Sequence, residues 1–161
     1  MAGNIIAYWG INKMKTLFTV GFTRKSAEQF FELLKRNSVD ILIDTRISNN
    51  SQLAGFTKSD DLKYFLKQIG DIYYSYRPDF APTKELLKDW RDNKITWEQY
   101  EIRYAFLLEQ RNTYKNFLKD YESFKNPCIL CSEATPEYCH RRLLAERLKK
   151  EFPDDIEVRH I

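Results

Sequence analysis

Two of the three cysteines and one of the two histidines in this 161-residue chain lie in one short segment. It runs from Cys131 to Arg142 and reads Cys-Ser-Glu-Ala-Thr-Pro-Glu-Tyr-Cys-His-Arg-Arg. The apolar run before it and the helical pattern after it predict that the segment joins a buried strand to the start of a helix. Free backbone N–H groups at a helix start create a positive field, which lowers the pKa of a thiol and favours neutral imidazole. The segment is therefore the first place to look for chemistry.

Four of its side chains are candidates for catalysis. Cys139 and His140, at the predicted helix start, suit a nucleophile and a general base. Cys131 ends the predicted strand, where a thiol would face the following loop. Glu133 could act as a general base or orient Arg141. The alternatives are that both cysteines are small buried residues, that His140 caps the helix and that Glu133 is a solvated loop carboxylate.

A metal site is a further alternative, because Cys131, Cys139 and His140 are zinc-type ligands and His160 offers a fourth. The spacing does not match the usual zinc patterns. Neighbouring residues on a helix also point about 100° apart, which hinders joint ligation by Cys139 and His140. Neither a metal nor a cofactor is therefore expected, and Cys128, inside the strand, is interpreted as packing.

Strand and helix patterns alternate along the chain. Apolar runs predict strands at 16–20, 40–44, 72–76, 128–131 and 156–161. The second of these shows no alternation of polar and apolar residues, as expected for a strand buried on both faces. The fold class is therefore expected to be α/β, with a largely parallel sheet flanked by helices and a helical insertion before the fourth strand.

The helical patterns have recognisable ends. Capping boxes begin at Ser26 and Thr96, Thr57 is predicted to cap a second helix, and Gly70 is predicted to stop it. Pro82 is predicted to open a short helix. The stretch that begins at Thr96 is expected to continue to about residue 121, with a break near 112–113.

Ligands of parallel sheets bind where the strands end, so the polar residues after each strand matter. Asp44 and Arg46 lie two apart and can form an ion pair at this edge. Arg46 would then hold an anion together with Arg141 and the helix N-terminus, or the pair would simply pin the loop. The aromatic stretch 73–77 could stack a base, although such stretches more often belong to the core and sheet surface.

Composition sets outer limits. The chain is 43% hydrophobic and 30% charged, with a net charge of +3, which permits an anionic ligand without requiring one. An odd cysteine count argues against a secreted disulfide framework, and no apolar run approaches the ~20 residues of a membrane span. A cytoplasmic protein with no membrane association is expected, organised as a single α/β domain over 14–161. Met14 resembles a second start, so 1–13 would be an N-terminal extension outside the core.

Several of these segments, in order, resemble the domain-of-unknown-function family 488, small bacterial and archaeal proteins of unassigned activity. The matching segments are Thr19–Ser26, Leu42–Arg46, Ser51 with Gly55–Thr57, Cys131–Arg141 and Val158–Ile161. The resemblance implies a fold but no reaction, and it adds Ser51 to the ligand-binding candidates, which also include His160 at the end of the last strand. Phe22 stands where the family has His or Tyr, and Gln52 where it has Arg, which implies altered or weaker binding here.

Three functions follow as hypotheses. The first is an enzyme, or a former enzyme, whose pocket binds or processes an anionic ligand such as a nucleotide or nucleic acid. The second is a thiol transferase that resembles rhodanese-type sulfurtransferases, with a persulfide on Cys131, although the loop after Cys131 is not glycine-rich. The third is a non-catalytic module that binds nucleic acid or protein. A closed pocket would favour an enzyme, and a broad groove would favour a module.

Overall fold

The computed structural model describes residues 15–50 and 54–161, and its centre is a five-stranded, wholly parallel sheet. The strand order is β3-β2-β4-β1-β5. The strands are β1 Lys15–Gly21, β2 Ile41–Asp44, β3 Tyr73–Tyr76, β4 Pro127–Cys131 and β5 Ile156–His160. The predicted α/β class with a largely parallel sheet is confirmed. The predicted extension 1–13 lies outside the described residues, and the division into extension and single domain stays a prediction.

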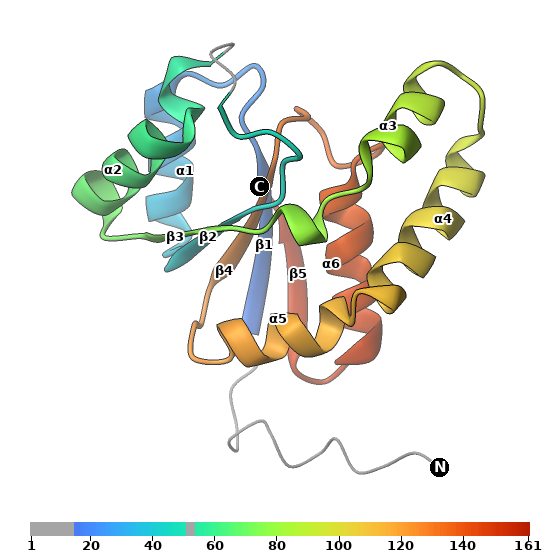
Figure 1. Cartoon of the computed structure of the whole chain (residues 1–161). Helices are drawn as coiled ribbons and strands as arrows, with labels where there is room; N and C mark the ends of the chain where they lie inside the picture. Colours follow the sequence, from blue (N-terminus) through green and yellow to red (C-terminus); the bar gives the residue numbers. More distant parts are fainter. Residues whose placement is uncertain (1–14, 51–53) are drawn as a thin grey trace.

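Helices cover both faces of the sheet (Figure 1). They are α1 Ala27–Arg36, α2 Ser59–Gly70, α3 Lys84–Arg91, α4 Trp97–Gln110, α5 Thr113–Tyr121 and α6 His140–Glu151. Helices α1 and α2 lie on one side and α3 to α6 on the other. The helical insertion before the fourth strand is thus α3 to α5. No helix in the described part of the chain is long and apolar enough to cross a membrane.

Strand β2 shows why its sequence lacks polar alternation. Ile41 and Ile43 belong to the core under α3 to α6, whereas Leu42 belongs to the core under α1 and α2. Both faces of the strand are therefore buried, as predicted. Cys128 of β4 is fully buried in the α1–α2 core, which confirms its interpretation as packing.

The predicted helix starts at Ser26 and Thr96 are confirmed. Each hydroxyl accepts from the backbone N–H three residues on, and a glutamine returns a hydrogen bond to the cap backbone. The predicted break near 112–113 also occurs. Asn112 has a left-handed backbone there, with a φ of 52°, so α4 ends and α5 starts in a new direction.

The predicted start of α2 is wrong by one residue, whereas its predicted stop at Gly70 is confirmed. Thr57 closes a short 3-10 turn and donates its hydroxyl to the Ala54 carbonyl oxygen at 2.8 Å, so it does not cap α2. Helix α2 starts at Ser59, behind Lys58, with no side-chain cap. At the other end the left-handed residue is Asp71, with a φ of 51°. A short aspartate side chain tolerates this conformation, so glycine was not required.

The central strands β1 and β4 define where a site can form. They are neighbours, yet the chain leaves β1 for α1 on one face and leaves β4 for α6 on the other. The connections diverge at the carboxyl ends of the two strands, and such a switch point opens a crevice. Segment 131–140 therefore emerges beside the β1–α1 loop.

Candidate functional site

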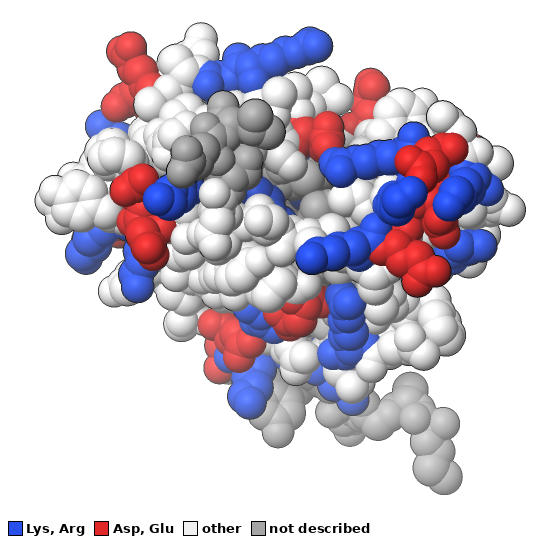
Figure 2. All heavy atoms as spheres, turned by 45° about the horizontal axis from the view of Figure 1, so that its top comes forward, with Lys and Arg blue, Asp and Glu red and all other residues white. Residues whose placement is uncertain are grey.

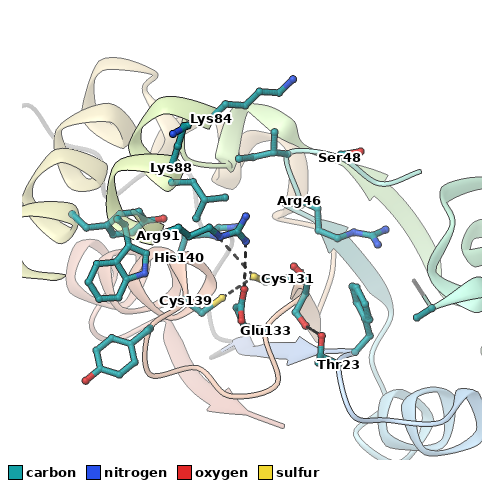
Figure 3. A pocket seen from close by; sticks show the side chains of 18 of the residues that line it. Thr23, Arg46, Ser48, Lys84, Lys88, Arg91, Cys131, Glu133, Cys139 and His140 are labelled. Carbon is teal, nitrogen blue, oxygen red and sulfur yellow. Dashed lines mark hydrogen bonds and ion pairs between the residues drawn. The ribbon is translucent and has the colours of Figure 1, made fainter. Parts of the chain in front are cut away.

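A cavity of about 980 Å³ opens at the carboxyl end of the sheet. Its walls come from the loop after β1, the loop after β2, helix α3 and the segment between Cys131 and His140. Figure 3 shows Lys84, Lys88 and Arg91 on one side and Thr23 and Arg46 on the other, with the two sulfur atoms between them. Segments distant in sequence thus converge on one hollow.

The walls of this cavity are predominantly basic. Among the described residues that line it, only Asp92 and Glu133 are acidic. The basic lining residues are Arg24, Lys25, Arg46, Lys84, Lys88 and Arg91. Lys84, Lys88 and Arg91 recur at intervals of four and three residues, which places them on one face of α3. Figure 2 shows basic side chains on the α3 side of this face, interspersed with acidic ones.

Aromatic rings form part of the same wall. Trp90 of α3, Tyr100 of α4 and Tyr138 of the loop before α6 all line the cavity. The Trp90 and Tyr138 rings are stacked, with centroids 5.9 Å apart, and Tyr138 is 61% exposed. The wall therefore offers a flat apolar surface beside the basic groups.

Two thiols lie in contact at the bottom of the cavity. Cys131 is the last residue of β4 and Cys139 immediately precedes α6. The thiol of Cys139 donates a hydrogen bond to the Cys131 sulfur, with the two Sγ atoms 2.7 Å apart. Both line the cavity, although only 3% of Cys131 and 2% of Cys139 is exposed. The fold thus brings together two residues that the sequence separates by eight positions.

His140 lies beside Cys131 in a fixed orientation. Its Nε2 is 3.0 Å from both the carbonyl oxygen and the hydroxyl of Thr45. A carbonyl oxygen only accepts hydrogen bonds, so Nε2 carries a proton. The Thr45 hydroxyl donates its own hydrogen bond to the Leu130 carbonyl oxygen at 2.9 Å. Nδ1 consequently faces the Cys131 sulfur, at 3.8 Å. An imidazole oriented by a third group beside a thiol is the arrangement of an activated nucleophile.

The charge distribution separates the two thiols. Burial by itself would raise the pKa of Cys131, but the hydrogen bond from Cys139 and the positive charge of His140 lower that pKa well below its ordinary value. Burial works against the charged form of His140 as well, yet the neighbouring Cys131 thiolate raises the His140 pKa. Burial and the same thiolate raise the pKa of Cys139. These shifts favour a Cys131 thiolate, a His140 imidazolium and a protonated Cys139.

This corrects the expectation from the helix start. The sequence predicted a lowered pKa for Cys139 and a neutral imidazole for His140, and both predictions are wrong in direction. The physical reason is proximity. A negative charge on Cys131 lies in direct contact with both groups, so its effect on their pKa values exceeds that of the partial charge at the helix terminus. It therefore favours a protonated Cys139 and a charged His140.

Arg141 lies beneath the cavity and not in its wall. Its side chain is 1% exposed, and Nη1 donates to the Glu133 carbonyl oxygen at 2.6 Å and to the Cys139 sulfur at 3.6 Å. The Glu133 carboxylate lines the cavity and lies 3.8 Å from Arg91, so Glu133 orients Arg141 only through its backbone. Arg141 braces the loop that presents the thiols. The predicted contact between Arg141 and an anion has no support from this geometry.

Asp44 and Arg46 form the predicted ion pair. Two guanidinium nitrogens donate to the buried carboxylate at 2.8 and 2.7 Å, and Tyr74 donates to the same carboxylate at 2.7 Å. Arg46 also donates to the Thr57 carbonyl oxygen at 2.8 Å, which pins the loop before α2. Arg46 lines the cavity, but its guanidinium reaches away from the sulfurs (Figure 3). Its Nη1 is buried and has no hydrogen-bond partner among the described residues.

The remaining candidates lie elsewhere. His160 is exposed at the end of β5, where Nδ1 contacts the Thr19 hydroxyl at 2.7 Å, and it does not line the cavity. Ser51 and Gln52 lie outside the described residues. Phe22 lines the cavity with its ring 5.3 Å from the Arg46 guanidinium carbon, so an apolar ring occupies the place of the polar family residue. The aromatic stretch 73–77 lies outside this lining.

The donor set of a metal site is present, but its arrangement suits a dithiol. The ligand atoms of Cys131, Cys139 and His140 lie within 4.8 Å of one another. Two thiolates on a tetrahedral zinc ion lie about 3.8 Å apart, given bonds of about 2.3 Å. The observed separation is 2.7 Å, and one sulfur donates a hydrogen to the other. The sulfurs would have to move apart by about 1 Å to hold zinc.

The sequence interpretation missed the basic face of α3 and the aromatic wall. The signal for the first was available, because Lys84, Lys88 and Arg91 follow helical spacing. That spacing does not say which way the face points, and α3 turns it toward the cavity only through its packing against α4. Tyr138 had no signal of its own, since loop tyrosines are common.

Comparisons with known proteins give one family and one distant relative. The family described as "Domain of unknown function DUF488" matches residues 26–148. The ketol-acid reductoisomerase (NADP(+)) of Blochmanniella pennsylvanica (strain BPEN) is 25% identical over 126 residues, which cover 76% of this chain. The matched part spans only 26% of that enzyme. No solved structure matches the chain.

Proposed function

The chain belongs to the DUF488 family, whose description names no activity, so we propose a function from the geometry of the site: the cavity binds a phosphate-bearing ligand. A nucleotide is the first choice of ligand. We place the protein in the cytoplasm, where buried thiols remain reduced.

The basic wall carries this proposal. Six basic and two acidic residues, among those described, surround one cavity in a protein whose net charge is only +3. The charge is therefore concentrated at this edge of the sheet. Lys88 pairs with Asp92 and Arg91 with Glu133, whereas Arg24 and Lys84 have no ion-pair partner in the described part of the chain, so their charge is available to a ligand. Hydrogen bonds between such groups and phosphate contribute about 1.5–3 kcal/mol each.

The volume and the aromatic wall favour a nucleotide over inorganic phosphate. A cavity of about 980 Å³ lies at the upper end of the range for small-molecule sites. The exposed ring of Tyr138, stacked on Trp90, gives a base an apolar surface, and stacking contributes about 1–3 kcal/mol. A hollow enclosed by three loops and a helix also favours a pocket over the broad groove of a binding module.

Calorimetric titration at low salt tests the proposal, with inorganic phosphate, ADP and a short single-stranded oligonucleotide as probes. The variant Lys84→Glu/Lys88→Glu reverses two charges on the cavity face of α3. Its matched control is Lys115→Glu/Lys119→Glu, which reverses two exposed lysines at the same spacing on α5, at the far end of the sheet.

We expect ADP to bind the unaltered protein, the α3 variant to bind about ten-fold more weakly or worse, and the α5 control to bind normally. If none of the probes binds, or if both double variants lose affinity equally, the phosphate proposal is wrong. Tight binding of the oligonucleotide alone would identify nucleic acid as the ligand.

A further inference from the structure

We infer that Cys131 and Cys139 form a reversible dithiol–disulfide pair that exchanges with small anionic disulfides entering the cavity. Cys131 is the attacking thiol and Cys139 the resolving thiol. This activity goes beyond the binding of phosphate-bearing ligands and does not depend on it, because it concerns the bottom of the cavity and a different chemical class of substrate.

The geometry of the two sulfurs carries the inference. Their separation of 2.7 Å is well inside an ordinary contact between sulfur atoms, and a disulfide bond of about 2.05 Å requires only a short further approach. Cys131 lies at the end of a strand and Cys139 at a loop–helix junction. The loop between them, Ser132 to Tyr138, forms no helix or strand.

The cavity gives a substrate access to this pair. Both cysteines belong to its lining, whereas Cys128 does not and is fully buried in the core under α1 and α2. The basic wall above the pair would attract a disulfide that carries carboxylates. Disulfides of the glutathione type have this chemistry, and a neutral disulfide of similar size should react more slowly.

His140 supplies the proton that the exchange needs. The Cys131 thiolate attacks one sulfur of the small disulfide, a mixed disulfide forms, and the departing thiolate takes the His140 proton. Cys139 then attacks the Cys131 sulfur, and its proton goes to the second departing thiolate. The balance is one protein disulfide and one neutral imidazole formed, with two small thiols released. A small thiol in excess reverses the sequence and restores the dithiol.

Intact mass after acid quenching and alkylation under denaturing conditions tests the inference. The reduced protein is incubated with oxidised glutathione, or with the neutral bis(2-hydroxyethyl) disulfide for comparison. We expect two thiols to disappear, leaving only Cys128 to be alkylated, and peptide mapping to join Cys131 to Cys139. Three alkylated cysteines after prolonged incubation, or a stable mixed disulfide on the unaltered protein, would overturn the inference.

Single variants separate the two roles. Cys139→Ser should accumulate a stable mixed disulfide at Cys131, whereas Cys131→Ser should leave Cys139 largely unreacted. Cys128→Ser is the control and should form the internal disulfide at the normal rate. Circular dichroism establishes that each variant folds. If folded Cys139→Ser forms no mixed disulfide, Cys131 is not the attacking thiol and the assignment fails. If the unaltered protein exchanges with the small disulfide as expected but does not bind ADP, only the phosphate proposal is refuted.

Discussion

At the residue scale, the proposed reactive group is the Cys131–His140 pair, which Cys139 and the Thr45 carbonyl oxygen hold in place. The Thr45 carbonyl oxygen fixes the proton on Nε2 of His140, so Nδ1 faces Cys131. The positive imidazole then favours the thiolate form of Cys131, and Cys139 donates a hydrogen bond to it. Each partner keeps another in its charged or protonated state, which makes the pair sensitive to single substitutions.

Replacing His140 by Asn should change how the reactivity of Cys131 depends on pH. In the unaltered protein the lowered Cys131 pKa keeps the thiolate populated as the pH falls below neutral. Without the imidazolium that pKa rises, so the thiolate fraction should fall about ten-fold for each pH unit below the new value. We expect iodoacetamide to label Cys131 of the variant at least ten-fold more slowly at mildly acidic pH. The two rates should converge in alkali.

Peptide mass spectrometry measures these rates residue by residue. Cys128, fully buried and with a pKa raised by burial, provides an internal reference that should react slowly in both proteins. Identical pH profiles for Cys131 with and without His140 would show that the imidazole does not control the thiol.

Gly21 determines how closely the end of β1 approaches the loop Ser132–Tyr138, which joins the two cysteines. A Cβ atom at this position would lie 1.7 Å from the Glu133 carbonyl oxygen and 2.9 Å from Nη1 of Arg141. Gly21→Ala should therefore displace the loop that presents the thiols and destabilise the protein by about 1–3 kcal/mol. Gly55→Ala is the matched control, since a Cβ there has nothing within 4 Å, and it should change stability by less than about 0.5 kcal/mol.

Urea denaturation measures both substitutions, and the iodoacetamide rate of Cys131 reports on the loop in the folded state. Equal stability of the two variants would mean that β1 and the loop can separate without cost, and the tight approach would then not position the thiols.

At the scale of elements, side-chain caps fix the first residues of α1 and α4, and so fix where the loops before these helices end. Ser26 caps α1 in a capping box, and α1 follows directly on the β1–α1 loop that lines the cavity. Thr96 does the same for α4, which packs against α3. Local hydrogen bonds therefore fix the starts of α1 and α4, the two helices that hold the β1–α1 loop and α3 at the cavity.

Removing the cap of α1 should cost about 1 kcal/mol. Ser26→Ala deletes the acceptor for the Gln29 N–H and leaves that group to water. Ser26→Thr keeps an acceptor and should restore most of the stability, since threonine is only slightly weaker as a cap. Thermal or urea unfolding of the three proteins measures the difference. A threonine variant as unstable as the alanine variant would rule out capping as the cause.

At the scale of the molecule, the cavity exists because the connections of β1 and β4 leave the sheet on opposite faces (Figure 1). The crevice is then lined from both sides, by the β1–α1 loop from one layer and by α3 from the other. The basic side chains come from different elements, so their joint field is a property of the assembled fold and should depend on ionic strength.

Ligand binding should stabilise the whole protein in a salt-dependent way. ADP at 100 times its Kd should add about 2.7 kcal/mol to the free energy of unfolding and raise Tm. The increase should shrink as salt screens the basic wall. Thermal unfolding at low and high salt, with and without ADP, measures the effect, and the α5 double variant should behave like the unaltered protein. An increase in Tm that salt does not reduce would argue against phosphate recognition by this wall.

Much of the architecture was determined by local sequence. The apolar runs predicted all five strands, and Ser26 and Thr96 predicted two helix starts, because strand burial and capping depend on neighbours within a few residues. The start of α2 was harder, because Thr57 donates its hydroxyl within a 3-10 turn and does not cap the helix.

The sequence also determined which segment holds the chemistry, by concentrating Cys131, Cys139 and His140 between a strand and a helix. Only the tertiary structure decided how these side chains are arranged. It placed Thr45 against His140, set the sulfurs in contact and turned Arg141 inward. The basic face of α3 likewise gained its meaning from packing. A pKa and a field depend on distances between residues far apart in the chain, and local patterns contain no information on those distances.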